Sequence, residues 1–396
     1  MFYIIMLWLF IISLIITLFK LLNIKKNYLI CFLITLLIVL FAINMDGSIA
    51  AALEGANLVA KAILPTIFPF TVICNLLIAF DGIGLYSKIM GPLFCKPLGL
   101  SKNCSFPIAA SFLCGYPLGA KYSSDLYNMG YIKKNEYQRL LNIASNAGPI
   151  FLIGSIGTAM LSNPIYGYIL LIANYLSIII VGFLTKKKNA NLNISSMSLP
   201  PYKEKNFGAA LKDSIESGIS TTLNIAAFVI IFSVIISIIK DNAYINIAFN
   251  NLETFLNFPK DSIYSLFLGS IEFTNGSKII ANSTLSIHIK LSMISFICSF
   301  SGLSILAQVS SFVSKDNISM GKYTLWKLVQ GILSFIITFV SSKVLLTTVP
   351  TSSITLNPST FNTIPLLLLP ILIILLVTLV LKIINYILNK LHVSKF

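Results

Sequence analysis

The sequence predicts an all-α polytopic membrane protein with about nine transmembrane helices, two re-entrant hairpins and inverted repeats. Hydrophobic residues make up 56% of the 396 residues and charged residues only 10%, where a soluble domain carries about 25%. Several apolar runs reach the roughly 20 residues that cross a hydrocarbon core. Glycine, proline and small polar residues interrupt these runs at matched places in the two halves, a pattern typical of transporters with a site at the bilayer midplane.

The basic residues give a net charge of +15 and set the predicted orientation. Lysines cluster in short loops, at 20–26, 133–139, 186–188, 203–205 and 390–395, which the positive-inside rule places in the cytoplasm. No basic stripe is interleaved with aromatic residues, so nucleic acid is not an expected partner. The N-terminus lacks the basic region and cleavage site of a signal peptide, and residues 2–19 are interpreted as a retained span.

In the first half, spans are expected at residues 2–19, 28–43 and 58–80, the last kinked by Pro65 and Pro69. Residues 105–120 are apolar but broken at Gly115 and Pro117, which predicts a re-entrant hairpin that enters from the cytoplasm. The next helix should break at 145–149, because the remaining apolar stretch to residue 161 covers only about 20 Å. A span at 165–184 completes this half.

The second half repeats this order in the opposite direction. We expect a helix at 219–239, a hairpin at 263–285, a helix at 289–312 broken at 299–302, and a span at 325–346, followed by a last span at 364–388. The first repeat then starts outside and the second inside, so the repeats are inverted. The predicted limits are peripheral spans at 1–45, a first repeat at 46–184, a cytoplasmic linker at 185–207, a second repeat at 208–346, and an extra span with a basic tail at 347–396.

The interrupted helices carry the candidate binding residues. A half-helix that begins at Pro149 has unpaired backbone N–H groups and a partial positive charge, which favour a carboxylate or phosphate. Ser145 or Asn146 would cap or line this end; the alternative is a structural kink. A leucine at Gly148 is expected to fill the cavity and stop transport while the protein stays folded.

The hairpins carry charged candidates. Lys121 and Lys278 occupy matched places and could each supply a countercharge for an anionic substrate. The alternative for Lys121 is a solvated cytoplasmic residue. Glu272 and Lys278 could instead form a structural pair, and Glu272 could take a proton or coordinate a coupling cation. The full set of substrate-binding candidates is Gly115, Tyr116, Pro117, Gly119, Lys121, Ser145, Asn146, Gly148, Pro149, Glu272, Asn275, Gly276, Lys278, Ser299, Ser301 and Gly302.

Signals of catalysis and of cofactor or metal binding are missing from the sequence. It contains no HExxH, GxSxG or Walker lysine motif, and its acidic residues are scattered singly. The six cysteines show no CxxC spacing and are expected as small buried hydrophobic residues. His288 and His392 are too far apart in sequence to suggest a metal cluster. We therefore expect no enzyme activity, no cofactor and no metal.

Two stretches resemble a known family. These are residues 106–127 (FPIAASFLCGYPLGAKYSSDLY) and 145–157 (SNAGPIFLIGSIG). Together with the repetition of the first half in the second, they are similar to the sporulation integral membrane protein YlbJ family, which belongs to the wider set of nucleoside-recognition "gate" domain proteins. The resemblance is most specific between residues 58 and 161. The second half departs from it, with Glu272-Phe-Thr-Asn where the first half has Gly115-Tyr-Pro-Leu.

The resemblance implies that residues 46–184 and 208–346 are gate-like repeats in a protein of an endospore-forming bacterium. It also implies that the protein moves dipicolinic acid from the mother cell across the outer forespore membrane. Two alternatives stay open: transport of another solute such as a nucleoside, and a non-transporting scaffold of a sporulation membrane complex. The expected partners are a small anionic solute and membrane lipids, and a homo-oligomer or sporulation membrane partners are left open.

Overall fold

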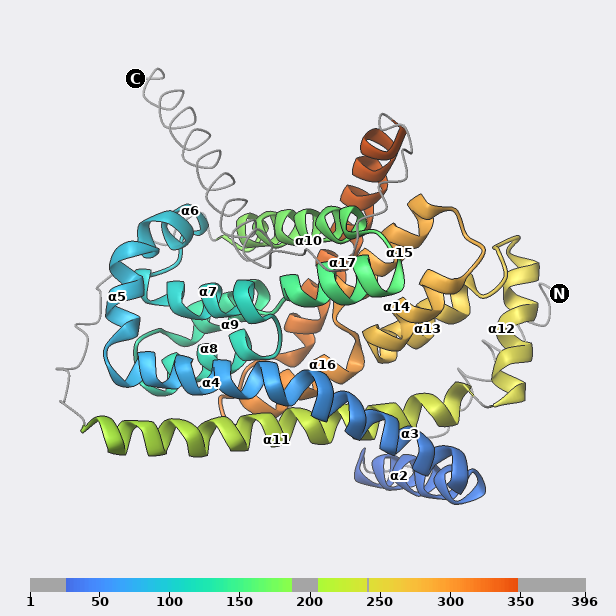
Figure 1. Ribbon diagram of the computed structural model, residues 1–396, viewed down its shortest axis with the longest axis horizontal. Coiled ribbons are helices and arrows are strands. Elements are labelled where there is room, and N and C mark those ends of the chain that lie inside the picture. The colour runs from blue at the N-terminus through green and yellow to red at the C-terminus, as the bar shows by residue number, and fades with distance from the viewer. Residues whose placement is uncertain (1–25, 187–205, 241, 348–396) are drawn as a thin grey trace, which may run out of the picture.

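The computed structural model describes residues 26–186, 206–240 and 242–347 (Figure 1). Within these ranges the regular structure is entirely helical and contains no β-strand. The predicted all-α membrane fold is therefore confirmed. The spans expected at 2–19 and 364–388, and most of the linker at 185–207, lie outside the described residues, and the domain limits stay a prediction.

Four helices of the described ranges are long and apolar enough to cross a membrane. They are α10 (Pro164–Leu184), α11 (Phe207–Lys240), the broken pair α15 (Ile287–Phe300) and α16 (Gly302–Val313), and α17 (Met320–Thr347). Two bent pairs raise this number to six if each is one span: α2 (Lys26–Ile43) with α3 (Met45–Leu58), bent by 100°, and α4 (Leu64–Ala79) with α5 (Gly82–Ile89), bent by 88°.

The span predicted at 58–80 is the second part of a longer helical rod. α3, the π-helical η1 (Val59–Ile63) and α4 follow one another without a gap, and Pro69 lies inside α4. The π-helical segment ends two residues before Pro65, which cannot donate a backbone hydrogen bond. Four short helices that the sequence did not predict lead to the first hairpin: α5, η2 (Gly91–Cys95), α6 (Lys96–Leu98) and η3 (Lys102–Cys104).

The interruptions predicted in the first half are present. α7 (Ser105–Cys114) and α8 (Leu118–Asn128) pack on each other as a hairpin whose tip is residues 115–117. α9 (Lys134–Ile143) ends before a non-helical stretch at 145–148, and the π-helical η4 (Ile150–Met160) continues after it. The short apolar length after the break therefore predicted its place correctly.

The second half contains the matching elements. α13 (Ser262–Ile271) and α14 (Phe273–Asn282) form the second hairpin, and α15 and α16 meet at a break at Ser301, whose φ is +79°. One helix, α12 (Ala243–Phe255), was not predicted; its exposed residues surround a buried Glu253.

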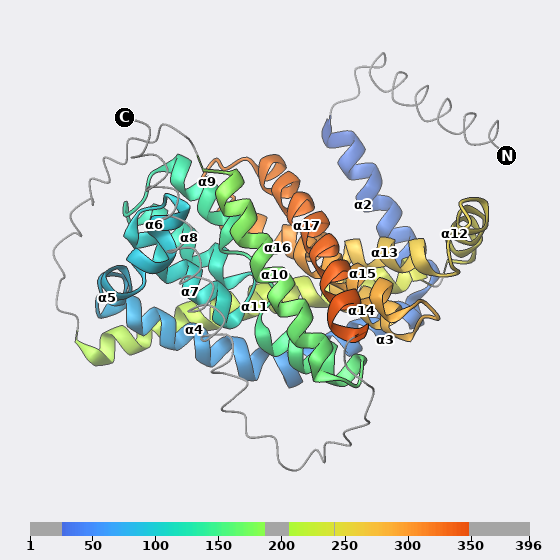
Figure 2. The ribbon, with the colours of Figure 1, turned by 90° about the horizontal axis from the view of Figure 1, so that it is seen from above.

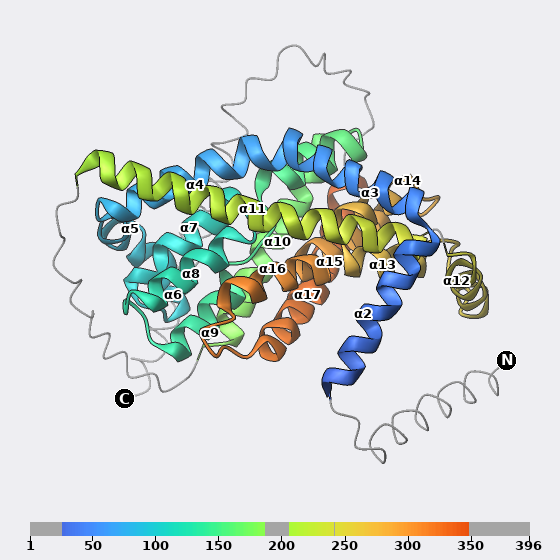
Figure 3. The ribbon, with the colours of Figure 1, turned by 90° about the horizontal axis from the view of Figure 1, so that it is seen from below.

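Matched helices of the two halves lie side by side and run in opposite directions. The α3–α4 rod and α11 cross the molecule together, as Figures 1 and 3 show. Asn75 of α4 donates to the Ser214 carbonyl at 3.4 Å, while Gly55 of α3 packs against Ser233 far along α11, so the pair is antiparallel. Helices α10 and α17 also pack together and run in opposite directions (Figure 2). This arrangement is that of an inverted repeat.

Burial separates the central helices from those at the surface. The apolar window of the α15–α16 pair is 78% buried, against 28% for α11 and for α17. Large apolar side chains remain exposed along α2, α11 and α17. A soluble protein rarely exposes apolar surface of this extent, and a bilayer is the solvent that suits it.

The antiparallel packing of α10 and α17 makes a testable prediction of topology. Two antiparallel helices that both cross a membrane place the end of α10 and the start of α17 on one side, and the lysine clusters predict that this side is the cytoplasm. On a cysteine-free background, Lys186→Cys and Lys322→Cys should react with an impermeant maleimide only in inverted vesicles. Ser162→Cys, at the other end of α10, should react in intact cells. Labelling of positions 186 and 322 from opposite sides would contradict the inverted fold.

Candidate functional site

The tips of the two hairpins meet inside the bundle. The ring of Tyr116, at the tip of α7–α8, lies edge-on to the ring of Phe273, at the start of α14, with centroids 5.1 Å apart. Phe273 also contacts Phe151 of η4, at 4.9 Å. The first helix break therefore lies beside both hairpin tips, although these segments are far apart in the sequence.

Each hairpin tip is also closed by the helix break of its own half. Gly115 has φ of +83°, and a Cβ there would lie 2.5 Å from the backbone nitrogen of Gly148. In the second half, a Cβ on Gly302 would lie 3.2 Å from the Gly269 and Ile271 carbonyl oxygens. In both halves a glycine therefore lies where the hairpin meets the helix break. It belongs to the hairpin tip in the first half and to the helix break in the second.

This geometry corrects the expectation for Gly148. A Cβ on Gly148 would lie 2.9 Å from the Cys114 carbonyl oxygen and 3.2 Å from the Gly115 nitrogen. The position therefore faces packed backbone, not a cavity, and leucine there should disturb the fold itself. Gly119 and Gly276 are also packing positions, because a Cβ on either would overlap neighbouring atoms, the Ala144 carbonyl in one case and Gly269 in the other.

Helix α17 holds the first break in place through three buried side chains. The Tyr323 hydroxyl donates to the Ser145 Oγ at 2.7 Å, and Lys327 Nζ donates to the Ser145 carbonyl at 2.6 Å. Gln330 accepts from Lys327 Nζ at 2.7 Å and donates to Asn146 Oδ1 at 3.3 Å. All three side chains are fully buried. The polar groups of the break are therefore satisfied by the other half of the protein.

These contacts correct the capping role expected of Ser145 and Asn146. Helix η4 begins after Pro149 and has no side-chain cap. Asn146 Nδ2 donates instead to Ser111 Oγ at 3.1 Å, and the Asn146 carbonyl accepts from the Tyr116 backbone at 2.6 Å. Both residues of the break face α17 and α7 and not the first turn of η4.

The three α17 residues belong to a longer polar stripe that sequence reasoning missed. Ser334, Thr338 and Ser342 continue it along the same buried face. Ser334 and Thr338 both bond Ser295 of α15, at 2.6 and 2.7 Å, and Ser342 lies 3.2 Å from Nδ1 of His288. The signal was present in the sequence, because polar residues recur every three or four positions through the apolar run at 325–346.

In the second hairpin, Glu272 serves as a helix cap. Its carboxylate accepts from the backbone nitrogens of Thr274 and Asn275, both at 2.9 Å, and from Asn275 Nδ2 at 3.0 Å. Lys278 is exposed, and no ion pair joins it to Glu272 in the described part of the chain, so the structural pair is wrong. Because Glu272 already occupies the positive end of α14, that helix end is closed to an anionic substrate.

Removal of this cap should destabilise the second hairpin. We expect Glu272→Ala to lower the free energy of unfolding by about 1–2 kcal/mol, the scale of a lost N-cap. Thermal unfolding of the purified protein in detergent measures this loss, and Lys278→Ala is the matched control on the same helix. Equal melting temperatures for the two variants would contradict the capping role.

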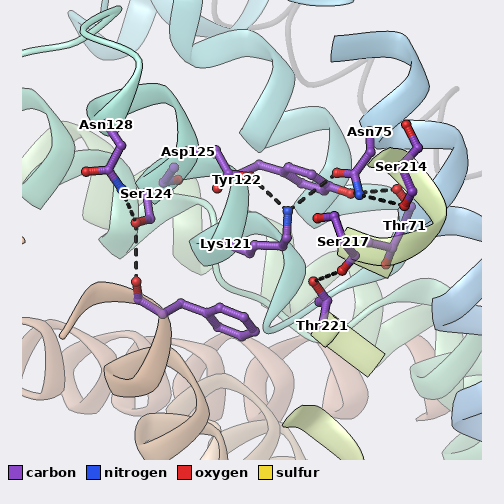
Figure 4. Close-up of polar contacts among 12 residues, drawn as sticks. Thr71, Asn75, Lys121, Tyr122, Ser124, Asp125, Asn128, Ser214, Ser217 and Thr221 are labelled. Carbon is purple, nitrogen blue, oxygen red and sulfur yellow. Dashed lines mark hydrogen bonds and ion pairs between the residues drawn. The ribbon is translucent and has the colours of Figure 1, made fainter. Parts of the chain in front are cut away.

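Lys121 lies in a second polar cluster, between α4, α8 and α11, which Figure 4 shows. It is 8% exposed, so it is not a solvated cytoplasmic residue. Its Nζ pairs with Asp125 at 2.8 Å, one turn further along α8, bonds Asn75 Oδ1 at 3.4 Å and lies 4.6 Å from the ring centroid of Tyr122. The Asp125 carboxylate already neutralises this lysine, so Lys121 lacks the unpaired charge that the countercharge of a substrate needs.

The remaining polar candidates lie at the second break. Ser301 Oγ donates to the Ser299 carbonyl at 3.4 Å. Ser299 is fully buried, and its own hydroxyl has no hydrogen-bond partner. The structure thus brings both hairpin tips to the first break, and the first break to α17. In the part of the chain that the structure describes, neither the Lys121 nor the Lys278 side chain bonds these residues.

Metal binding finds no support in the described ranges, which contain no group of three His, Cys, Asp or Glu side chains suited to an ion. The five cysteines at 74, 95, 104, 114 and 298 are buried or half-buried, whereas Cys31 is exposed on α2.

Comparison with known proteins agrees with the resemblance seen in the sequence. Residues 60–141, which include the first hairpin, match the Gate family, described as nucleoside recognition. The chain is 25% identical over 309 residues to the sporulation integral membrane protein YlbJ of Bacillus subtilis (strain 168), covering 72% of this chain and 76% of that protein.

Solved structures of CNTnw show a likeness at lower identity. A CNTnw variant in its intermediate 1 state has a TM-score of 0.46 and 18% identity, covering 76% of this chain and 86% of that one. CNTnw in an inward-facing substrate-bound state has a TM-score of 0.43 and 15% identity, covering 77% and 85%. The two sequence comparisons confirm the family resemblance: this chain is similar over most of its length to the sporulation membrane protein YlbJ, and its residues 60–141 match the Gate family.

Proposed function

We propose that this protein is a sporulation membrane transporter that moves a small carboxylate from the mother cell across the outer forespore membrane, with dipicolinate as the first candidate. The observation that carries the proposal is that both hairpin tips meet at the first helix break, which in turn bonds the polar face of α17. Transporters build substrate sites from such interrupted helices, because irregular backbone at membrane depth must be buried in protein or line a polar path.

The scaffold alternative explains this assembly poorly. A scaffold needs apolar helix faces, and straight helices supply these without exposing backbone groups. Here two helices are interrupted, and the side chains around the breaks include a fully buried lysine and two hydroxyls, on Tyr116 and Ser299, that have no partner. Buried polar groups of this kind in a membrane protein mark a functional site by default.

A nucleoside is the second candidate, favoured by the Gate match. The buried lysine at the break favours an anion over it, since a nucleoside is neutral. Dipicolinate is a small planar dianion with two carboxylates that accept charge-assisted hydrogen bonds. It therefore fits a site that offers an ammonium group and hydroxyl donors.

Dipicolinate content of spores tests the proposal. A deletion strain should make dipicolinate in the mother cell at the normal level but form spores that contain little of it. Complementation with the wild-type gene should restore the content. Spores with normal dipicolinate in the deletion strain would contradict the substrate. Normal dipicolinate together with impaired nucleoside uptake would favour the second candidate.

A further inference from the structure

The stripe along α17 contains one ammonium group, and its acceptors are uncharged. Lys327 is fully buried, and its Nζ bonds the Ser145 carbonyl at 2.6 Å and Gln330 Oε1 at 2.7 Å. The buried lysine of α8 differs, because Lys121 has a carboxylate at 2.8 Å. The other ion pair in the described ranges, between Lys212 and Glu216, lies on the surface.

A buried charge without a partner of opposite sign is costly, and more so within a membrane. Two neutral oxygens satisfy two of the three donors of the ammonium group and leave its charge uncompensated. A neutral side chain such as glutamine could hold the Ser145 carbonyl at lower cost. The lysine therefore suits a site whose counter-ion comes from outside the chain.

The position of Lys327 relative to the second break follows from the register of α15 and α17. His288 faces Ser342, Ser295 faces Ser334, and Phe296 packs on Gly331. The two helices are thus antiparallel, and this register brings Ser299 opposite Gln330. Ser299 lies one turn from Ser295 on the face that meets α17.

Two unpartnered hydroxyls lie at this level of the bundle. The Ser299 side chain is fully buried and its Oγ has no partner. The Tyr116 hydroxyl is also buried without a partner, and the Tyr116 backbone bonds the break at Asn146. Hydroxyls donate well to a carboxylate, and these two lie near the contact between Lys327 and the first break. They are a second sign of a ligand site, independent of the lysine.

We propose that Lys327 is the countercharge of the anionic substrate. A carboxylate takes the place of a neutral acceptor on Nζ, between the first break and Ser299, and the hydroxyls of Ser299 and Tyr116 donate to it. This inference rests on the proposed transport of a carboxylate and deepens it, because it moves the binding charge from Lys121 and Lys278 to a residue of α17.

Affinity for dipicolinate tests the assignment. Purified protein in lipid nanodiscs is titrated with dipicolinate in a calorimeter, as wild type, Lys327→Met and Lys322→Met. Lys322 is the matched control, since it is exposed on the same helix. We expect Kd to rise about tenfold to hundredfold in Lys327→Met, the effect of losing a charge-assisted hydrogen bond. Lys322→Met should stay within about twofold of the wild type.

A neutral probe separates charge from shape. Pyridine-2,6-dicarboxamide has the outline of dipicolinate without its charge, so its weaker binding should be the same in wild type and Lys327→Met. Wild-type affinity of Lys327→Met for dipicolinate would overturn the assignment. If that variant does not fold, a cryo-EM structure of the wild type with dipicolinate decides: a carboxylate within hydrogen-bond distance of Nζ supports the assignment, and a ligand elsewhere overturns it.

The two proposals fail in different ways. Wild-type protein that binds no dipicolinate contradicts the proposed substrate. Benzoate, succinate and citrate then test the countercharge alone: an anion that binds the wild type and loses at least tenfold in Lys327→Met supports it. Binding of none of them overturns the assignment of Lys327 as well.

Discussion

Gly148→Leu is expected to lower the free energy of unfolding by roughly 3 kcal/mol or more, an effect beyond most single substitutions. The cause is steric, because the first atom of any side chain would meet the Cys114 carbonyl and the Gly115 nitrogen, and both are backbone. The break and the hairpin tip would have to separate. Thermal unfolding of the purified protein and its abundance in membranes measure the loss.

Gly154→Leu is the matched control. Gly154 lies in η4, the half-helix that follows the same break, and a Cβ there meets no atom within 4 Å. The change should therefore alter stability by no more than about 0.5 kcal/mol. Equal melting temperatures for the two variants would show that residue 148 faces open space, as the sequence suggested, and would contradict the packed tip.

Glu253→Ala should be the second large effect. The Glu253 side chain is 2% exposed, and its carboxylate accepts from the backbone nitrogens of Asp261, Ile263 and Tyr264, at 2.7, 2.7 and 3.0 Å. Alanine would leave the start of the second hairpin without these bonds, at a cost of roughly 3 kcal/mol. Hydrogen exchange at residues 261–264 should rise together with a fall in melting temperature.

Glu54→Ala provides the comparison, since Glu54 is exposed on α3. This variant should keep the hydrogen exchange at residues 261–264 and the melting temperature near the wild-type values. Protection of residues 261–264 that survives in Glu253→Ala would rule out the carboxylate as their cap.

The interruptions of the fold could be predicted from the sequence because they depend on local chemistry. Gly115 and Pro117 break a short apolar run, and the stretch after Pro149 is too short to span. Both effects are independent of the neighbouring helices. The inverted order also followed from local signals, namely lysine-rich loops and repeated helix breaks.

The partners of the interrupted residues could not be predicted in this way. Ser145 bonds Tyr323 and Lys327, almost half the chain away, and no local pattern pairs them. The sequence could not decide whether Lys121 is a substrate countercharge or a solvated residue, because its burial depends on α4 and α11. Asp125, one turn later on the same helix, did indicate an ion pair. The spacing of polar residues in α17 was a signal too, and it would have pointed to Lys327.

The substrate site that we propose lies where α17 meets the helix breaks of both halves. The α10–α17 and α4–α11 pairs then supply two antiparallel contacts between the repeats. In transporters built from such repeats, one repeat rocks against the other around a fixed site. The hydrogen bond from Lys327 to the Ser145 carbonyl joins the two repeats. A rocking motion of one repeat against the other would have to break or rearrange such contacts.

The most direct measurement is dipicolinate uptake by the purified wild-type protein in proteoliposomes, with protein-free liposomes and the Lys327→Met variant run in parallel. The account predicts uptake that saturates with dipicolinate, exceeds the protein-free rate and falls at least tenfold in Lys327→Met, while Lys322→Met transports normally. Uptake no faster than in protein-free liposomes, by protein shown to be folded, would contradict the central claim that this chain carries the solute.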